Sequence, residues 1–525
     1  MDTRPDPSSA SAATVARPLP ASSAQERLWF FSQLVPDIAV YNVPCRMEIG
    51  VPGQRVDVNA VQAALAVVVA RHETLRTRLA TRDGQLTQLV HGEVPVQVEY
   101  TDLRGLPAAE CETRAAEIAA QDAATPIPLD RAPLWRARLI HRADDHCQLV
   151  FVVHHAVFDG LSAENFTVEL LRGYHALRAG ERPDLAELPL QYGDFAAWQR
   201  ERMATGELDD QMAYWRRALA DPPPPLRLPA LGAGQYRAGG PHRGGHVMFA
   251  VPAPLTRQVR ELARSHRTTP YVVLLAGFAI LLHRLTGESD LLIGTPVSGR
   301  NRPALAASIG MFVNTLVLRA DCSGQPGLGD LVDRMRGTVM DALDNQDVAY
   351  DHVVKVLAPD RDASGSPLHR VVFNLLPGAS IDDLDNGTAK VDLLIGVAEQ
   401  PDAYAGRLEY RGDLFDEPAA TALTARLLRL LTAGLADPGT PIGRLPLLDD
   451  AERRRVLAAT FDAPAAAEPE GVIDLFAARV AARPELTAVV DAAGDRLSYR
   501  ALDEQSSRLA RHLATVAPVG PDARV

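Results

Sequence analysis

The stretch QLVFVVHHAVFDGLS, residues 148–162, constrains the fold of this chain more than any other. The run from Cys147 to Val153 is short, mostly apolar and rich in valine and phenylalanine, which favours a central β-strand over a helix. After it, Ser162 can cap a helix, because a serine side chain accepts a hydrogen bond from a free backbone N–H group. Apolar residues then recur on one helical face: Phe166, Leu170, Leu171, Tyr174 and Leu177. A buried strand followed by an amphipathic helix predicts a mixed α/β fold.

The same mixture of strands and helices fills two long regions. The 525 residues exceed the size of one ordinary domain. We expect a flexible leader over 1–21, a first mixed region over 22–185 and a second over 186–455. The Pro- and Ala-rich stretch within 456–471 lacks periodicity, which predicts a linker. Residues 472–525 then restart with a helix, strand, turn, strand and helix pattern that stops before it completes a core.

Charge and composition exclude several classes of function. The formal net charge is −12 and the basic residues are scattered, which argues against a nucleic-acid partner. No segment approaches about 18 uninterrupted apolar residues and no signal-peptide run is present, so we expect no membrane span and a cytoplasmic protein. The cysteines lie far apart without a CxxC pair, which predicts reduced thiols and no metal site: Cys45, Cys111, Cys147 and Cys322.

His154-His155-x-x-x-Asp159-Gly160 is the candidate catalytic signature. Neighbouring side chains of a strand alternate in direction, so one imidazole can face a cavity while the other is held by packing. An unperturbed imidazole has a pKa of about 6.5, which suits proton transfer at cellular pH. Asp159 can act as a second acid–base group or can lock the loop by pairing with an arginine, and Gly160 permits a sharp turn and a close backbone approach. Neither GxSxG nor HExxH occurs, so covalent hydrolysis and zinc chemistry lack their signatures.

HHAVFDG, residues 154–160, resembles the active-site signature of nonribosomal peptide synthetase condensation domains. Further segments match that family's motifs in the family's order, over about residues 20–450: SSAQERLWFFSQL, YNVP, RHETLRTRL, YGDFAAWQ, IGTPVSGRNRP, IGMFVNTLVLR, NQDVAYDHVV and RDASGSPLHRVVFNLL. The resemblance implies two lobes similar to chloramphenicol acetyltransferase, arranged as a V-shaped pseudo-dimer with a central tunnel. Leu79, Leu161 and the stretch EYRGDLFD depart from the usual motifs, which affects the choice of subtype and not the chemistry.

The resemblance also implies a reaction. The family joins two thioesters that arrive on the phosphopantetheine arms of carrier proteins, and the domain itself binds no cofactor. The amine of the acceptor attacks the donor carbonyl and a peptide bond forms. By resemblance, His155 faces the reaction chamber, where it either takes the proton of the amine or positions the amine and stabilises the tetrahedral species.

The implied partners are an upstream donor carrier, a downstream acceptor carrier and an adjoining adenylation domain. Because the chain opens at Met1 with a short leader, we expect the donor carrier to be a separate protein. RLSYRALDEQSSRLARHLA, residues 496–514, is similar to the first stretch of an adenylation domain. The phosphate-binding motif expected later in such a domain does not follow, so 472–525 is expected to be a truncated start that does not activate amino acids.

Other residues receive supporting roles from the same resemblance. Asp159 is implied to be structural, with Arg76 of RHETLR as its partner. His154 is implied to be structural rather than catalytic. Ser298 and Asn314 lie in matched segments of the second lobe, where they either line the tunnel or anchor loops.

Relatives with other functions are the alternatives. An epimerisation domain carries Trp where this chain has Ala163, together with a later EGHGR-like motif that this chain lacks. A heterocyclising relative has aspartates in place of the histidines. An ester-forming relative with a hydroxyl acceptor fits the same pocket. A catalytically silent platform that docks carriers or tailoring enzymes is a fourth alternative, although silent members usually lose the signature that is intact here.

Overall fold

The computed structural model describes residues 16–229, 242–357, 368–376, 384–461, 471–491 and 494–516. The predicted leader up to residue 15, the linker residues 462–470 and the motif residues 361–367 lie outside the described residues. Contacts divide the chain into two compact units, Met1–Leu447 and Leu448–Val525. The first unit contains two hydrophobic cores, one for each predicted lobe.

The N-terminal lobe is built on a four-stranded sheet in the order β2-β7-β6-β5. Its strands are β2 (Asn42–Ile49), β5 (Val98–Asp102), β6 (Trp135–Ala143) and β7 (His146–His154). β7 pairs antiparallel with β2 and β6, and it is buried along almost its whole length. Burial on both faces explains why its sequence is a continuous apolar run rather than an alternating one.

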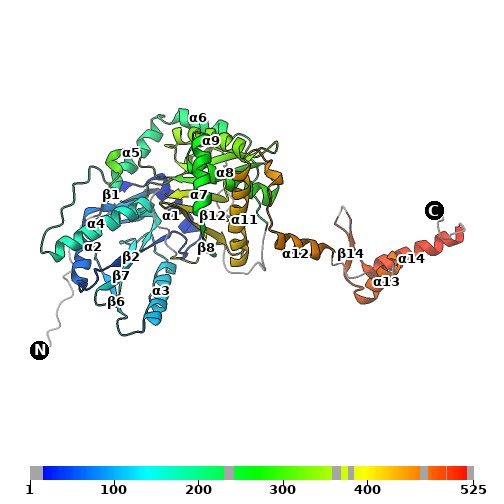
Figure 1. Ribbon diagram of the computed structural model, residues 1–525, viewed down its shortest axis with the longest axis horizontal. Helices are drawn as coiled ribbons and strands as arrows, with labels where there is room; N and C mark the ends of the chain where they lie inside the picture. The colour runs from blue at the N-terminus through cyan, green and yellow to red at the C-terminus, as the bar shows by residue number, and fades with distance from the viewer. Residues whose placement is uncertain are drawn as a thin grey trace. The chain divides into compact units, whose positions relative to one another are not determined.

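Helices cover this sheet, as Figure 1 shows. α2 (Val58–Arg71) and α4 (Gly160–Arg178) pack against each other, and α3 (Ala108–Ala124) contacts β2 and β7. A three-stranded antiparallel sheet lies beside them in the order β1-β4-β3: β1 (Arg17–Pro20), β3 (Thr77–Arg82) and β4 (Gln85–Val90). Because residues 17–20 form a strand, the predicted leader ends before residue 17.

Short elements complete this lobe. α1 (Ser23–Leu34) begins with a capping box in which Ser22 and Gln25 satisfy each other's backbone N–H groups. The 3₁₀ turn η1 (Glu73–Arg76) follows α2, and η2 (His155–Val157) follows β7. α1 packs directly on η2, so the start of the chain supports the turn that carries His155.

The C-terminal lobe is built on a six-stranded mixed sheet in the order β10-β9-β11-β12-β13-β8. The strands are β8 (Gly244–Val251), β9 (Asp290–Val297), β10 (Asn314–Asp321), β11 (Val371–Leu376), β12 (Leu393–Glu399) and β13 (Tyr404–Arg411). The helices are α7 (Ala253–Ser265), α8 (Pro270–Thr286), α9 (Leu328–Asp344), α10 (Tyr350–Leu357) and α11 (Glu417–Ala436), with the turns η3 (Pro303–Leu305) and η4 (Ile442–Arg444).

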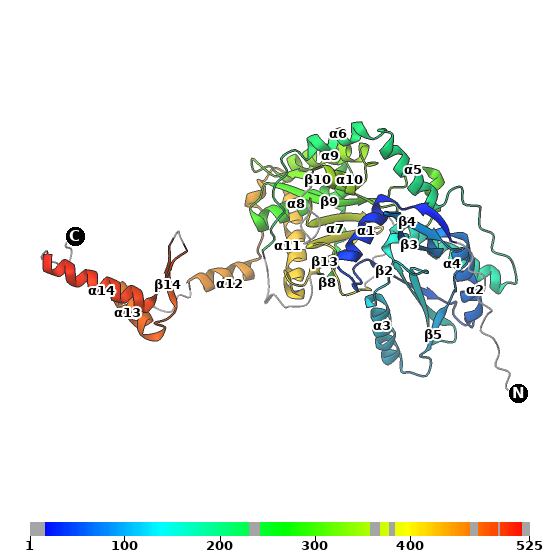
Figure 2. The same ribbon diagram turned by 180° about the vertical axis from the view of Figure 1, so that it is seen from behind.

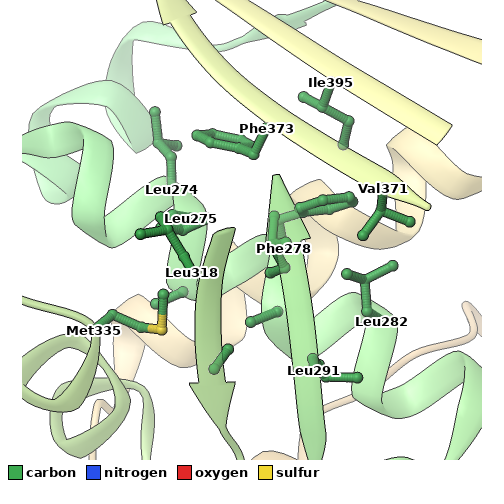
Figure 3. Close-up of a cluster of buried hydrophobic side chains, with 14 of the residues drawn as sticks. Leu274, Leu275, Phe278, Leu282, Leu291, Leu318, Met335, Val371, Phe373 and Ile395 are labelled. Atoms are coloured by element: carbon green, nitrogen blue, oxygen red, sulfur yellow. The ribbon is translucent and has the colours of Figure 1, made fainter. Parts of the chain in front are cut away.

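α8 is the centre of the C-terminal core. In Figure 3 its Phe278 lies against Phe373 of β11, with ring centroids 5.8 Å apart, and Leu282 points towards Val371 of β11. α11 packs against α8, α7 and β8, and Figure 2 shows it beside the sheet. By length and composition alone α11 is apolar enough to cross a membrane, but its buried leucines belong to this core. Core helices pass the same test.

Among the described residues, several segments reach from one lobe into the hydrophobic core of the other. α5 (Tyr192–Ala204) contributes Tyr192 and Phe195 to the N-terminal core, whereas α6 (Asp209–Ala218) contributes Trp215 to the C-terminal core. The N-terminal core therefore extends past the predicted division at residues 185 and 186. From the second lobe, four residues of the β9–β10 connection and one residue before β12 join the N-terminal core: Leu305, Ile309, Met311, Phe312 and Leu384.

The second unit contains α12 (Asp450–Phe461), α13 (Val472–Ala482), β14 (Thr487–Val490), β15 (Arg496–Ser498) and α14 (Tyr499–Val516). β14 and β15 pair antiparallel, which confirms the predicted helix, strand, turn, strand and helix order. No residue of α13 or α14 is buried.

Candidate active site

The end of β7 positions the two histidines of the signature. His154 is the last residue of the strand and lies opposite Asn42 of β2 in the register. His155 opens the turn η2, and its backbone N–H donates to the carbonyl oxygen of Tyr41 at 2.8 Å. His154 is 6% exposed, whereas His155 is less buried. Because β7 ends at His154, the alternation expected for the two neighbouring rings does not extend to His155, whose direction is set by the turn η2.

The hydrogen bonds of His155 define which of its nitrogens is free. Nδ1 lies 2.7 Å from the carbonyl oxygen of Phe158, and a carbonyl can only accept, so Nδ1 carries the proton. In the neutral ring Nε2 is then a bare acceptor. Burial lowers the pKa of His155 to about 3, and the positive charges of Lys390 and Arg27 also lower it. The imidazole is therefore neutral at cellular pH.

His154 has the opposite tautomer. Its Nδ1 accepts a hydrogen bond from the backbone N–H of Ala156 at 3.0 Å, so the proton of the neutral ring is on Nε2. Burial lowers the pKa of His154 to about 3, and the neighbouring His155 contributes to the shift. Through this hydrogen bond to Ala156, the His154 side chain stabilises the turn η2. The contact agrees with the structural role expected for His154.

Asp159 is the most strongly held carboxylate of the site. It is fully buried and forms a bidentate pair with Arg300, whose Nη1 and Nη2 lie 2.7 and 2.9 Å from its two oxygens. Asp159 also caps α4 by accepting from the N–H of Ser162 at 2.9 Å, so the expectation that Ser162 is the cap is wrong and Ser162 lies in the first turn of the helix. The backbone N–H of Phe312 donates to its other oxygen at 3.0 Å, and Arg300 stacks over the Phe312 ring. The pair thus ties the signature loop of the first lobe to the β9–β10 connection of the second.

The expected pairing of Asp159 with Arg76 is wrong. Arg76 instead donates to carbonyl oxygens at the end of α2, namely Val69 and Ala70 at 3.2 Å each. It also donates to the carbonyl oxygens of His91 and Gly92. A cation at the last turn of a helix satisfies free carbonyls and complements the helix dipole, so Arg76 is a local fold residue. Arg300 lies within the matched segment IGTPVSGRNRP, but no spacing rule in the sequence assigns it to Asp159.

Asn314 and Ser298 are the two residues of the second lobe that were expected at the site. Asn314 donates to the carbonyl oxygens of Gln346 and Val348 at 2.9 and 2.7 Å and accepts from the N–H of Tyr350, so it anchors a loop. It also lines two cavities at the lobe junction, neither of which His155 lines. Ser298 is exposed, and its hydroxyl accepts from the N–H of Arg300 at 3.4 Å. The tunnel that leads to His155 stays a prediction.

Gly160 is the first residue of α4, directly after its cap Asp159. A Cβ added to Gly160 would meet no atom within 4 Å, and its φ is not in the left-handed region. The chain itself therefore does not require a glycine there, contrary to the expectation of a sharp turn. The backbone at Gly160 has open space beside it.

Two buried residues support the site through hydrogen bonds that sequence reasoning did not predict. Gln25 of α1 donates from Nε2 to the carbonyl oxygen of Ala156, inside η2, at 3.1 Å. The Tyr192 hydroxyl lies 2.7 Å from the Ser22 hydroxyl and donates to the carbonyl oxygen of Met311 at 2.9 Å. Burial raises the pKa of Tyr192, so its hydroxyl stays protonated. Both residues lie in motifs matched above, but only their contacts reveal their tasks.

Among the described residues, no group of three or more His, Cys, Asp or Glu side chains could hold a metal ion.

Comparison with known proteins agrees with this geometry. Residues 15–457 match the family model described as "Condensation domain". The chain is 36% identical over 526 residues to the phosphinothricin tripeptide synthetase PhsC of Streptomyces viridochromogenes, a match that covers 96% of this chain and 47% of that protein. It is 35% identical over 509 residues to a linear gramicidin synthase of Brevibacillus parabrevis, covering 94% of this chain but only 6% of that protein. The chain thus spans less than half the length of these curated relatives.

Solved structures give the same fold. The first condensation domain of the calcium-dependent antibiotic synthetase, in complex with a substrate analogue, superposes with a TM-score of 0.70 and 25% identity, covering 83% of this chain and all of that one. The X-domain in its complex with OxyB from teicoplanin biosynthesis has a TM-score of 0.73 and 26% identity, covering 86% and 98% of the two chains. The expected mixed α/β, two-lobed class is confirmed. The chain therefore belongs to the condensation domain family and is a condensation domain of the nonribosomal peptide synthetase type.

Proposed function

We propose that this chain forms an amide bond between a donor acyl or peptidyl thioester and the amine of an acceptor aminoacyl thioester. Both substrates arrive in the cytoplasm on phosphopantetheine arms of an upstream and a downstream carrier protein. The observation that carries this proposal is the imidazole of His155, which is neutral and presents a bare Nε2 beside an intact HHxxxDG signature.

In the proposed step, the acceptor nitrogen forms a bond to the donor carbonyl carbon and the carbon–sulfur bond of the donor thioester breaks. One proton leaves the nitrogen and the departing thiolate takes up a proton, so the step is balanced. The low pKa of His155 makes a full imidazolium unfavourable, so we assign Nε2 to accepting the amine N–H and orienting its lone pair. Holding two tethered reactants in line then supplies several kcal/mol of the rate enhancement.

The direct test loads both carriers and measures the dipeptidyl product by intact mass. We expect His155→Ala to lower product formation by roughly 100-fold, the size of the loss that a misplacement of the reacting groups by about 1 Å can cause. His175→Ala is the matched control, because His175 is an exposed histidine on α4. Wild-type rates in His155→Ala would contradict the assigned role.

A hydroxyl acceptor in place of the amine would give an ester instead. A second candidate function is a silent docking platform, because an X-domain has been solved in a complex with OxyB and resembles this chain in fold. The same assay separates these alternatives. An ester product supports the first, and a chain that binds a tailoring enzyme but yields no product with any loaded pair supports the second.

We further propose that residues 472–525 belong to the start of an adenylation domain. The linker expected over 456–471 overlaps the helix α12 as far as Phe461, so it begins later than predicted. The large apolar exposure of α13 supports an incomplete core, since Val472 and Ile473 are 84% and 80% exposed.

A further inference from the structure

A short segment before β12, residues 384–390, connects the two lobes, and we name it the arm. On the side of the second lobe, the Gly387 carbonyl oxygen accepts from the N–H of Gly244 in β8 at 3.1 Å. On the side of the first lobe, Leu384 is 8% exposed and belongs to the N-terminal core. The arm is therefore fixed at both lobes rather than lying free on either.

Asn386 of the arm clamps a turn of the first lobe. Its Nδ2 donates to the carbonyl oxygens of Ala39 and Asn42 at 3.0 and 3.1 Å. Its Oδ1 accepts from the N–H and the hydroxyl of Thr388 at 3.1 and 2.6 Å. Two acceptors on one side and two donors on the other fit only this orientation of the amide.

The clamped turn is the one that holds His155. The Tyr41 carbonyl oxygen, between the two carbonyls bound by Asn386, accepts the backbone N–H of His155 at 2.8 Å. Asn42 also lies opposite His154 in the β2–β7 register. A shift of this turn would therefore move the backbone of both histidines.

We propose that Asn386 is a positioning residue of the condensation reaction, which fixes the place of the His155 imidazole by clamping the Ala39–Asn42 turn. This inference rests on the proposed role of His155. Reaction rates are sensitive to such placement, because a misplacement of about 1 Å can cost roughly 100-fold. The arm thereby makes the first-lobe signature depend on a residue of the second lobe.

The test compares Asn386→Ala and Asn386→Asp with the wild type in the loaded-carrier assay. Asn386→Asp keeps the size of the side chain but places a carboxylate oxygen, which cannot donate a hydrogen bond, against the carbonyl oxygens of Ala39 and Asn42. We expect kcat to fall by roughly 10- to 100-fold with little change in KM for either carrier. Asn165→Ala is the matched control, because Asn165 donates to the carbonyl oxygen of Ala306 at 2.8 Å and has no contact with the turn. It should stay within about 2-fold of the wild type.

A double-mutant cycle distinguishes positioning from a general loss of structure. In a His155→Ala background, Asn386→Ala should lower the residual rate by less than about 2-fold, because its target is gone. A fall by the same factor as in the wild type would overturn the proposal. If Asn386→Ala does not fold, Thr388→Val, which removes only the hydroxyl that orients the amide, should show a smaller fall with the same non-additivity. A His155→Ala protein with full activity would overturn both proposals, whereas normal His155 dependence with additive effects would overturn only this one.

Discussion

Replacing Arg300 with alanine should destabilise the first unit far more than replacing an exposed arginine. The side chains of Arg300 and Asp159 are 3% and 0% exposed. Arg300→Ala would leave the Asp159 carboxylate buried with the donors Ser162 and Phe312 but without a counter-charge. Breaking a buried ion pair from one side costs about 3–5 kcal/mol. The first unit runs from Met1 to Leu447, and an unfolding entropy of about 2.1 cal/mol/K per residue means that 1 kcal/mol shifts its melting temperature by roughly 1 °C, so we expect a fall of roughly 3–5 °C.

Thermal unfolding followed by circular dichroism measures this effect. Arg114→Ala is the matched control, because the Arg114–Glu117 pair has a similar distance of 2.9 Å but side chains that are 59% and 57% exposed. Exposed pairs contribute about 0–1 kcal/mol, so the control should melt within about 1 °C of the wild type.

A double-mutant cycle then tests the identity of the partner. Asp159→Ala and Arg300→Ala should be strongly non-additive, because each removes the same contact. Asp159→Ala and Arg76→Ala should add to within about 0.5 kcal/mol, although Arg76→Ala alone is destabilising through the lost carbonyl contacts of α2. Coupling of Asp159 to Arg76 together with additivity towards Arg300 would refute the reasoning.

Three further results are expected. The pKa of His154 in the folded state, about 3, lies below the unfolded value of about 6.5, so the neutral ring stabilises the fold fully above pH 6.5 and this contribution is lost as the pH falls towards 3. His154→Asn should therefore make the decrease in the free energy of urea unfolding between pH 7 and 4 shallower. An unchanged pH dependence of that free energy would contradict this. Tyr192→Phe leaves the Met311 carbonyl without this donor and should cost about 1–3 kcal/mol in urea unfolding, whereas no loss would show that the bond contributes nothing. A fragment of residues 471–525 should bind a hydrophobic dye and show no cooperative melting, because α13 and α14 have no buried residue, and a sharp transition would argue against an incomplete core.

The residue pattern within single elements was sufficient to predict much of the secondary structure around the site. The apolar run up to Val153 predicted β7, and the helical spacing of the apolar residues from Phe166 onwards predicted α4. These inferences depend on residues a few positions apart, whose geometry the backbone sets by itself. The partner of Asp159 could not be found in this way, since Arg300 is 141 residues further along the chain. Arg76 was the plausible partner by motif, but α2 had its own free carbonyls for that guanidinium to satisfy.

By itself, the amino-acid sequence determined the mixed α/β class, the strand that leads into the two histidines and the amphipathic helix that follows them, because periodicity acts over single elements. Only the tertiary structure decided which nitrogen of His155 is bare, which arginine holds Asp159 and which side chain clamps the Ala39–Asn42 turn. Each of those depends on where a distant segment crosses from one lobe to the other, and such a crossing leaves no local pattern in the residues that it joins.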